Sequence, residues 1–225
     1  ADHRLLLCDS LQKKDRFETF PAFSPDGRTL YFCSAEAKKI PEEYKEIRYN
    51  LCSIDFDPSA GTFGSRIDTL VNAEALGKSV SFPRPSYDGK YIMFTLSDYG
   101  NFSIWHKEAN LWLLDLTSGD LRKLSEVNSD DTESFHNWSS NSRWFVFSSR
   151  RGDGLYTRLY LASMDENGKI SKPFLLPQED PETYYDRSVY SYNVPDFTSE
   201  PIKIDTRVFE KKITSKERIQ VQAKK

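Results

Sequence analysis

Short apolar runs alternate with turn-forming polar groups along most of the chain, and one 15-residue pattern of this kind occurs three times without gaps. The copies read FPAFSPDGRTLYFCS at residues 20–34, FPRPSYDGKYIMFTL at residues 82–96 and FHNWSSNSRWFVFSS at residues 135–149. Their first residues are 62 and 53 positions apart. A pattern that returns at such a period indicates repeated supersecondary units, which bury their faces against one another.

Each copy predicts one unit of four antiparallel strands. The 15-residue pattern supplies the end of the first strand, a tight turn and the second strand, and two further apolar runs follow it. Several of these runs are almost continuously apolar, which is typical of strands covered on both faces. The strands predicted after the first are residues 29–34, 50–56 and 66–71, then 91–96, 110–116 and 121–125, and finally 144–149, 158–164 and 174–176.

The connections differ in length according to the end of the unit on which they lie. The first and third connections are tight turns rich in Asp, Asn, Ser and Gly. The second connection and the link to the next unit are longer, and in an antiparallel meander they gather at the opposite end. Binding residues concentrate on loops held by a rigid scaffold, so we expect any site at this long-loop end. Within these loops, residues 38–47 suggest a short helix that Pro41 would disturb.

The run at residues 4–8 corresponds by the first spacing to the last strand of a unit. The sequence therefore predicts that the chain starts in the middle of an architecture. We expect repeated units in residues 1–177 and an extension with a charged tail in residues 178–225. Within this extension, the expected features are strand-like segments at residues 190–194 and 202–204 and a helical or disordered tail from residue 210.

Composition narrows the class of protein. Aromatic residues make up 14% of a chain whose mean hydropathy is −0.64, a balance that many half-solvated strands produce. A net charge of −3 argues against a nucleic-acid-binding domain, despite the basic run at residues 211–225. No apolar stretch is long enough to span a membrane. The three histidines and Cys8, Cys33 and Cys52 lack metal-ligand spacing, so no metal or other cofactor is expected, and no disulfide pair is selected.

Residues 23–32, FSPDGRTLYF, resemble the repeat of TolB-like β-propellers, which are also described as WD-repeat-like. The second copy has Tyr87 in place of Pro, and the third has Asn141 and Ser142 in place of Asp and Gly. The resemblance extends over residues 5–177. It implies an all-β fold of four-stranded antiparallel blades, with about three complete blades and a leading strand.

Closed propellers need at least about four blades, and this family commonly has about six. The resemblance therefore leaves three sources for the remainder: a missing N-terminal portion, strands supplied by residues 189–204, or another chain.

The resemblance also implies a non-catalytic scaffold that binds a protein or peptide partner, located in the periplasm or at the outer membrane of a bacterial cell envelope. Binding is expected at the long-loop end and the axial opening. Trp105 lies in a long loop with Tyr99, Phe102 and His106, which form the best candidate for an exposed recognition patch. The strand residues Trp112, Trp138 and Trp144 are expected in the core. The candidate contacts are Arg16, Glu18, Arg84, Tyr99, Trp105, Glu133, His136 and Arg150.

No catalytic signature is present. The sequence has no G-x-S-x-G element, P-loop or G-x-G-x-x-G. The acidic residues Asp130, Asp131 and Glu133 lack an EF-hand pattern and indicate a solvated loop. The Arg-Gly-Asp at residues 151–153 is a short match that arises often by chance. Two alternatives remain: an accessory propeller of a larger prolyl oligopeptidase-like hydrolase, or a carbohydrate-binding or lyase propeller with carboxylates near its axis.

Overall fold

Three four-stranded sheets make up most of the computed structural model, which describes residues 4–218 and 222–224. Within each sheet the strands pair antiparallel in chain order. The sheets form blade 1, with β2 (Arg16–Phe23), β3 (Thr29–Glu36), β4 (Asn50–Asp57) and β5 (Thr62–Val71), blade 2, with β6 (Ser79–Pro85), β7 (Tyr91–Ser97), β8 (Asn110–Asp115) and β9 (Leu121–Lys123), and blade 3, with β10 (Glu133–Trp138), β11 (Trp144–Ser149), β12 (Arg158–Ser163) and β13 (Phe174–Leu175).

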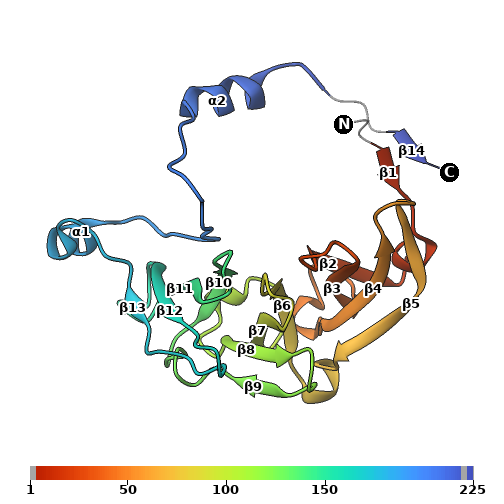
Figure 1. The fold of residues 1–225 in the computed structure, drawn as a ribbon, viewed down its shortest axis with the longest axis horizontal. Helices are drawn as coiled ribbons and strands as arrows, with labels where there is room; N and C mark the ends of the chain where they lie inside the picture. The colour runs from red at the N-terminus through yellow and green to blue at the C-terminus, as the bar shows by residue number, and fades with distance from the viewer. Residues whose placement is uncertain (1–3, 219–221, 225) are drawn as a thin grey trace.

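The blades are arranged around a common axis. The first strands, β2, β6 and β10, contact one another across neighbouring blades. Figure 1 shows these three strands on the inner side of the arrangement, whereas β5, β9 and β13 lie on the outer side. The prediction of three complete four-stranded antiparallel blades is therefore confirmed.

The packing of β7 explains why the central strands read as almost continuous apolar runs. Ile92, Phe94 and Leu96 belong to the core between blades 1 and 2. Met93, which points to the other face, belongs with Trp138 to the core between blades 2 and 3. Successive side chains of a strand alternate between faces, so a strand in the middle of a stack buries both sets.

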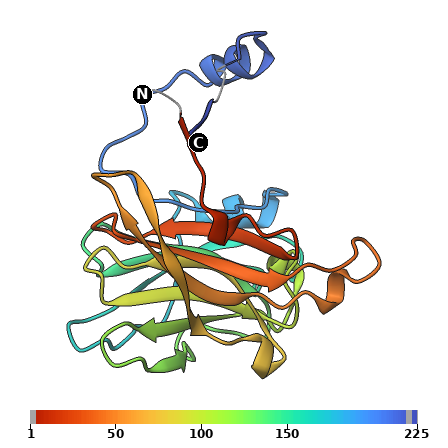
Figure 2. The same ribbon diagram turned by 90° about the vertical axis from the view of Figure 1, so that its right-hand side faces the viewer.

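The tight turns lie together at one end of every blade. Gly27 and Gly89 adopt φ of 68° and 72° at these turns, and Ser142 takes the equivalent position with φ of 57°. Figure 2 shows the loop between β3 and β4 projecting from the end of the blade opposite the β4–β5 turn. One backbone hydrogen bond joins the two turns of each blade, from Phe56 N–H to Arg28 O (2.7 Å), from Leu116 N–H to Lys90 O (2.8 Å) and from Met164 N–H to Arg143 O (2.8 Å).

The segments outside the blades depart from the sequence predictions. The leading strand exists as β1 (Arg4–Leu6), but it pairs in parallel with β14 (Gln222–Lys224) in a separate two-stranded sheet. Residues 190–194 and 202–204 form no strands, and the first sheet receives none from residues 189–204. The expected helix at residues 38–47 is reduced to the 3-10 turn η2 (Tyr44–Glu46).

Two short helices follow blade 3. α1 (Pro181–Arg187) begins after Asp180, whose carboxylate accepts a hydrogen bond from Thr183 N–H at 3.1 Å. α2 (Thr206–Thr214) begins after Asp205, whose carboxylate accepts one from Arg207 N–H at 3.0 Å. Side-chain acceptance of this kind satisfies donors that the first helical turn leaves free. The helix therefore begins at Thr206, whereas the sequence predicted a helical or disordered tail from residue 210.

The C-terminal extension covers blade 3 before it leaves the blades. Arg158 donates hydrogen bonds to the carbonyl oxygens of Tyr190 (2.7 Å) and Ser188 (2.9 Å). Tyr192 N–H donates to Thr157 O at 3.2 Å, and its carbonyl accepts from Ser148 Oγ at 2.8 Å. These contacts hold the chain, as far as Tyr192, against β11 and β12 of blade 3.

Candidate functional site

Three phenylalanines occupy the same position in the three innermost strands. Phe20, Phe82 and Phe135 have φ of 53°, 53° and 49°, and each lies at an irregularity in the pairing between the first and second strands of its blade. The ring centroids are 4.3 Å apart between Phe20 and Phe82 and 4.7 Å apart between Phe82 and Phe135. All three side chains remain half-exposed. We call Phe20, Phe82 and Phe135 the axial row.

The axial row is held at a cost in backbone energy. Residues with a side chain rarely adopt positive φ, and such a conformation costs on the order of 1–3 kcal/mol. The same conformation recurs in three blades, so it belongs to the repeat. Strain of this kind clusters at functional sites, where the surrounding structure enforces it.

This strain predicts that Gly is more stable than Ala at position 82, the reverse of the usual order in a strand. In an ordinary strand, Gly is less stable than Ala by roughly 0.5–1 kcal/mol. At the positive φ of Phe82, Gly relieves the strain that Ala retains. We expect Phe82→Gly to be more stable than Phe82→Ala by about 1 kcal/mol in urea denaturation. The ordinary order should hold at Thr95, a buried strand position of the same blade. Ala more stable than Gly at position 82 would contradict the strain.

A loop of blade 2 lies at the mouth of the axial row. Ser103, in the 3-10 turn η4 (Ser103–Trp105), has its Oγ 3.3 Å from Ser81 Oγ and 3.1 Å from Ser134 Oγ. Its carbonyl accepts a hydrogen bond from Thr132 Oγ1 at 3.1 Å. Ser81 and Ser134 directly precede Phe82 and Phe135, so η4 bridges blades 2 and 3 beside the row.

This loop exposes large apolar side chains. Phe102 is 80% exposed with φ of 52°, and Trp105 is 66% exposed. The Arg150 guanidinium lies over the Trp105 ring at 4.4 Å from its centroid, a cation–π contact between blades 2 and 3. Tyr99 is half-buried, and its ring centroid is 4.1 Å from that of the buried His106. We call Phe102, Trp105 and Arg150 the aromatic mouth.

Glu133 lies below the mouth and is fully buried. Its carboxylate accepts hydrogen bonds from Ser129 Oγ (2.6 Å) and Ser149 Oγ (3.0 Å) and pairs with the Arg151 guanidinium at 2.8 Å. Burial raises its pKa, and the hydrogen bond from Ser129 and the charge of Arg151 oppose that shift. The interpretation of a solvated acidic loop is therefore wrong for Glu133, which anchors the loop internally and presents no surface to a partner.

His136 is also enclosed. Its Nε2 lies 2.9 Å from Met93 O, which fits a neutral ring donating from Nε2. Burial lowers the pKa of His136 to about 3, and the hydrogen bond with Met93 opposes the shift. His136 therefore stays neutral at physiological pH and is unavailable for surface contacts.

The depressed pKa of His136 predicts a pH-dependent stability. Between pH 6.5 and 3 the unfolded chain binds a proton at this residue and the folded chain does not, so stability falls as pH decreases. From pH 7 to pH 5 this residue alone should lower the free energy of unfolding by about 2 kcal/mol. Urea denaturation of the protein and of His136→Gln at both pH values measures the difference. If the free energy of unfolding changed equally with pH in both proteins, His136 would not be the source of the pH dependence.

The remaining candidates lie on the innermost strands. Arg16 Nε donates to Ser34 Oγ at 2.8 Å, and Ser34 Oγ donates to Glu18 at 3.3 Å. Burial raises the pKa of Glu18, and the Ser34 hydrogen bond opposes that shift. The backbone of Arg84 is fixed because its carbonyl accepts from Trp138 Nε1 at 3.1 Å. Arg16, Glu18 and Arg84 are half-buried and lie on the strands that carry Phe20 and Phe82.

Other sequence features have structural roles. In the Arg-Gly-Asp segment, Arg151 is bound to Glu133, and Asp153 pairs with Arg158 at 3.7 Å. Trp138 is in the core as expected, whereas Trp144 is exposed. Cys8, Cys33 and Cys52 are free thiols. Within residues 4–218 and 222–224, no cluster of side chains suits a metal ion, and no helix is long and apolar enough to cross a membrane.

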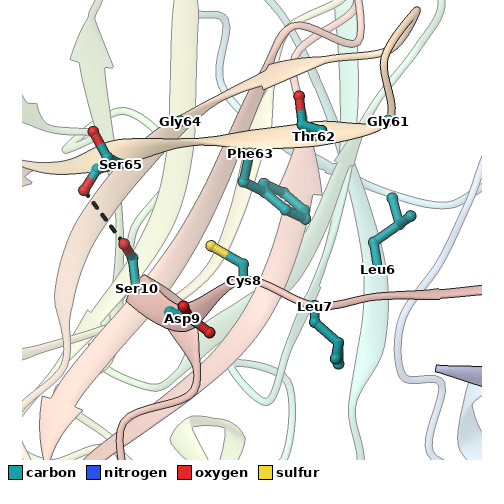
Figure 3. A pocket seen from close by; sticks show the side chains of 10 residues that line it. All are labelled: Leu6, Leu7, Cys8, Asp9, Ser10, Gly61, Thr62, Phe63, Gly64 and Ser65. Carbon is teal, nitrogen blue, oxygen red and sulfur yellow. Dashed lines mark hydrogen bonds between the residues drawn. The ribbon is translucent and has the colours of Figure 1, made fainter. Parts of the chain in front are cut away.

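One cleft lies away from the axis. It has a volume of about 560 Å³ between the N-terminal segment and β5. Figure 3 shows Leu6 and Phe63 in this cleft, with Ser10 Oγ donating to Ser65 O at 3.3 Å. Cys8 and Asp9 are its titratable lining groups. This lining offers no paired acid and base of the kind that general acid–base catalysis uses.

Comparison with solved structures identifies the architecture. A puromycin-hydrolyzing peptidase from Mycobacterium tuberculosis matches with a TM-score of 0.50 at 16% identity, over 73% of this chain and 24% of that one. The fold is that of a β-propeller. This β-propeller chain also matches TolB from Acinetobacter baumannii with a TM-score of 0.43 at 19% identity, over 72% of this chain and 33% of that one. The TolB-like resemblance of the repeats agrees with this fold.

A third match is the β-propeller domain of the Trilobed protease from Pyrococcus furiosus, with a TM-score of 0.43 at 17% identity, over 74% of this chain and 44% of that one. The aligned part of the chain spans less than half the length of each of these three proteins. No family model and no curated protein match the sequence.

The structure brings together only some of the candidate contacts named from the sequence. Trp105 and Arg150 contact each other at the mouth, whereas Tyr99 packs on His106. The axial row was missed, although its phenylalanines begin the three aligned copies. The signal was their recurrence at a fixed position next to Pro21, Pro83 and His136.

Proposed function

We propose that this chain is a non-catalytic β-propeller scaffold that binds a protein or peptide partner at the aromatic mouth. The observation that carries the proposal is the exposure of Phe102 and Trp105 on a loop whose base is fixed by buried serine hydrogen bonds. Trp and Arg are enriched among the interface residues that contribute most of the binding energy. A rigid base keeps the ordering cost of binding low.

The non-catalytic part of the proposal rests on the candidate acid and base. Glu133 is neutralised by Arg151, and His136 is enclosed and neutral. Neither has an open face toward a substrate.

The proposed setting is the bacterial periplasm or the periplasmic side of the outer membrane, by the TolB-like resemblance of the repeats. Cell fractionation with an antibody against the chain tests this setting. Recovery in the cytoplasmic fraction would contradict it.

The alternative is an accessory propeller of a larger hydrolase, since peptidases with propellers are among the structures of similar fold. The full-length gene separates the two functions. A downstream α/β domain with a G-x-S-x-G element would support the hydrolase.

Capture from envelope extract tests the binding proposal. We expect proteins enriched on the immobilised chain to be lost with the double variant Phe102→Ser/Trp105→Ala. Tyr87→Ala is the matched control, because Tyr87 is 54% exposed on the tight-turn end. Quantitative mass spectrometry should show the same enriched proteins for Tyr87→Ala and for the unmodified chain. Equal enrichment on the double variant would overturn the proposal.

A further inference from the structure

α2 has an apolar face without a partner among the residues that the structure describes. Val208, Phe209 and Ile213 are each more than half exposed on this nine-residue helix. Phe209 and Ile213 are four positions apart and therefore lie on one side. An isolated helix of this length is marginal in water, so it needs a packing surface to persist.

The chain is anchored to the rest of the structure on both sides of α2. On one side, Tyr192 and Asn193 are bonded to blade 3 through Ser148 and Thr157. On the other side, β14 pairs with β1 next to blade 1. Figure 1 shows α2 on the far side of the open space that β2, β6 and β10 face.

A long link joins α2 to blade 3. Twelve residues separate Asn193 from Thr206, and such a link reaches up to about 40 Å when extended. Successive rings of the row are less than 5 Å apart, so one short helix can contact several of them. Val194 adopts φ of 49°, a strained conformation for a β-branched residue, where the chain leaves blade 3.

We propose that the axial row is a docking site for an apolar helical face and that α2 is its occupant. Phe209 and Ile213 pack on the half-exposed rings of Phe20, Phe82 and Phe135. Tethering gives α2 an effective concentration in the millimolar range at the row. A partner that enters the axis has to displace α2. This inference stands independently of the aromatic mouth, because it uses none of its residues.

Photo-crosslinking tests the docking without altering the row. We place p-benzoylphenylalanine at position 209 in the full chain, irradiate it and map adducts by mass spectrometry. The expected adducts join position 209 to peptides that contain Phe20, Phe82 or Phe135. The control places the probe at Lys211, on the other side of α2, and should give at least about fivefold less of these adducts.

Mixing isotope-labelled and unlabelled chains distinguishes docking of the chain's own α2 from docking of α2 from a second copy. Adducts of a single isotope composition support docking of the chain's own α2. Mixed-isotope adducts would show that α2 binds a second copy and would overturn the proposal, as would adducts only outside the row or none. Circular dichroism confirms that each probe-bearing chain is folded.

Discussion

Replacing Arg151 by methionine is expected to lower the free energy of unfolding by about 3–5 kcal/mol, because it leaves the buried Glu133 carboxylate without its cation. The Glu133 side chain is fully enclosed, and that of Arg151 is only 19% exposed. Arg151 also donates to Val127 O at 2.5 Å and lies over the Tyr160 ring at 4.6 Å from its centroid. Urea denaturation at pH 7 measures the loss.

Two comparisons separate the buried charge from lost packing. Glu133→Gln/Arg151→Met should be more stable than Arg151→Met alone, because the double variant buries no unpaired carboxylate. The stability difference between Arg151→Met and the unmodified protein should also shrink as pH falls, since the raised pKa of Glu133 allows it to take up a proton. The exposed pair Arg143–Glu166 gives the matched control, and Arg143→Met should cost less than about 1 kcal/mol. Similar losses at positions 143 and 151 would contradict this account.

Trp138→Ala is expected to lower the free energy of unfolding by about 3–5 kcal/mol. Trp138 is buried between blades 2 and 3, and its ring centroid is 5.4 Å from that of Phe145. Its Nε1 donates to Arg84 O in the neighbouring blade at 3.1 Å. The substitution therefore opens a cavity and leaves a backbone acceptor unpaired across one interface. Thermal unfolding and urea denaturation should both report it.

Trp138→Phe separates the two contributions. It keeps most of the packing and loses the hydrogen bond to Arg84, so a loss of about 1–2 kcal/mol is expected. Trp144→Ala is the matched control, because Trp144 is exposed on the same hairpin and should cost less than about 1 kcal/mol. If Trp138→Ala were as mild as Trp144→Ala, the inter-blade core would not depend on this ring.

The blades could be predicted from the sequence because their signals are local and repeated. The turn residues and the apolar runs define each hairpin, and three copies define the period. The extension after residue 177 lacks that repetition. Its apolar runs at residues 190–194 and 202–204 suggested strands, but hydrogen bonds from Arg158 and Ser148 fix the first of them as irregular chain on blade 3.

The site could be predicted only where exposure follows from loop position. Trp105 lies in a long loop, and the loop places it on the surface. Glu133 lies one residue after a polar loop, and only the fold brings Arg151 and Ser149 to its carboxylate. The axial row depends on positive φ at phenylalanine, which residue preferences do not indicate. Both cases depend on the folded arrangement of the strands, and no local sequence pattern records it.

The most direct test of the binding proposal is photo-crosslinking in cells that produce the full protein. p-Benzoylphenylalanine replaces Phe102 or Trp105 at the mouth, or Tyr87 on the tight-turn end. The account predicts a discrete adduct of higher mass from positions 102 and 105, and none from position 87. Absence of adducts at both mouth positions, or the same adducts from position 87, would contradict the claim that the aromatic mouth binds a protein partner.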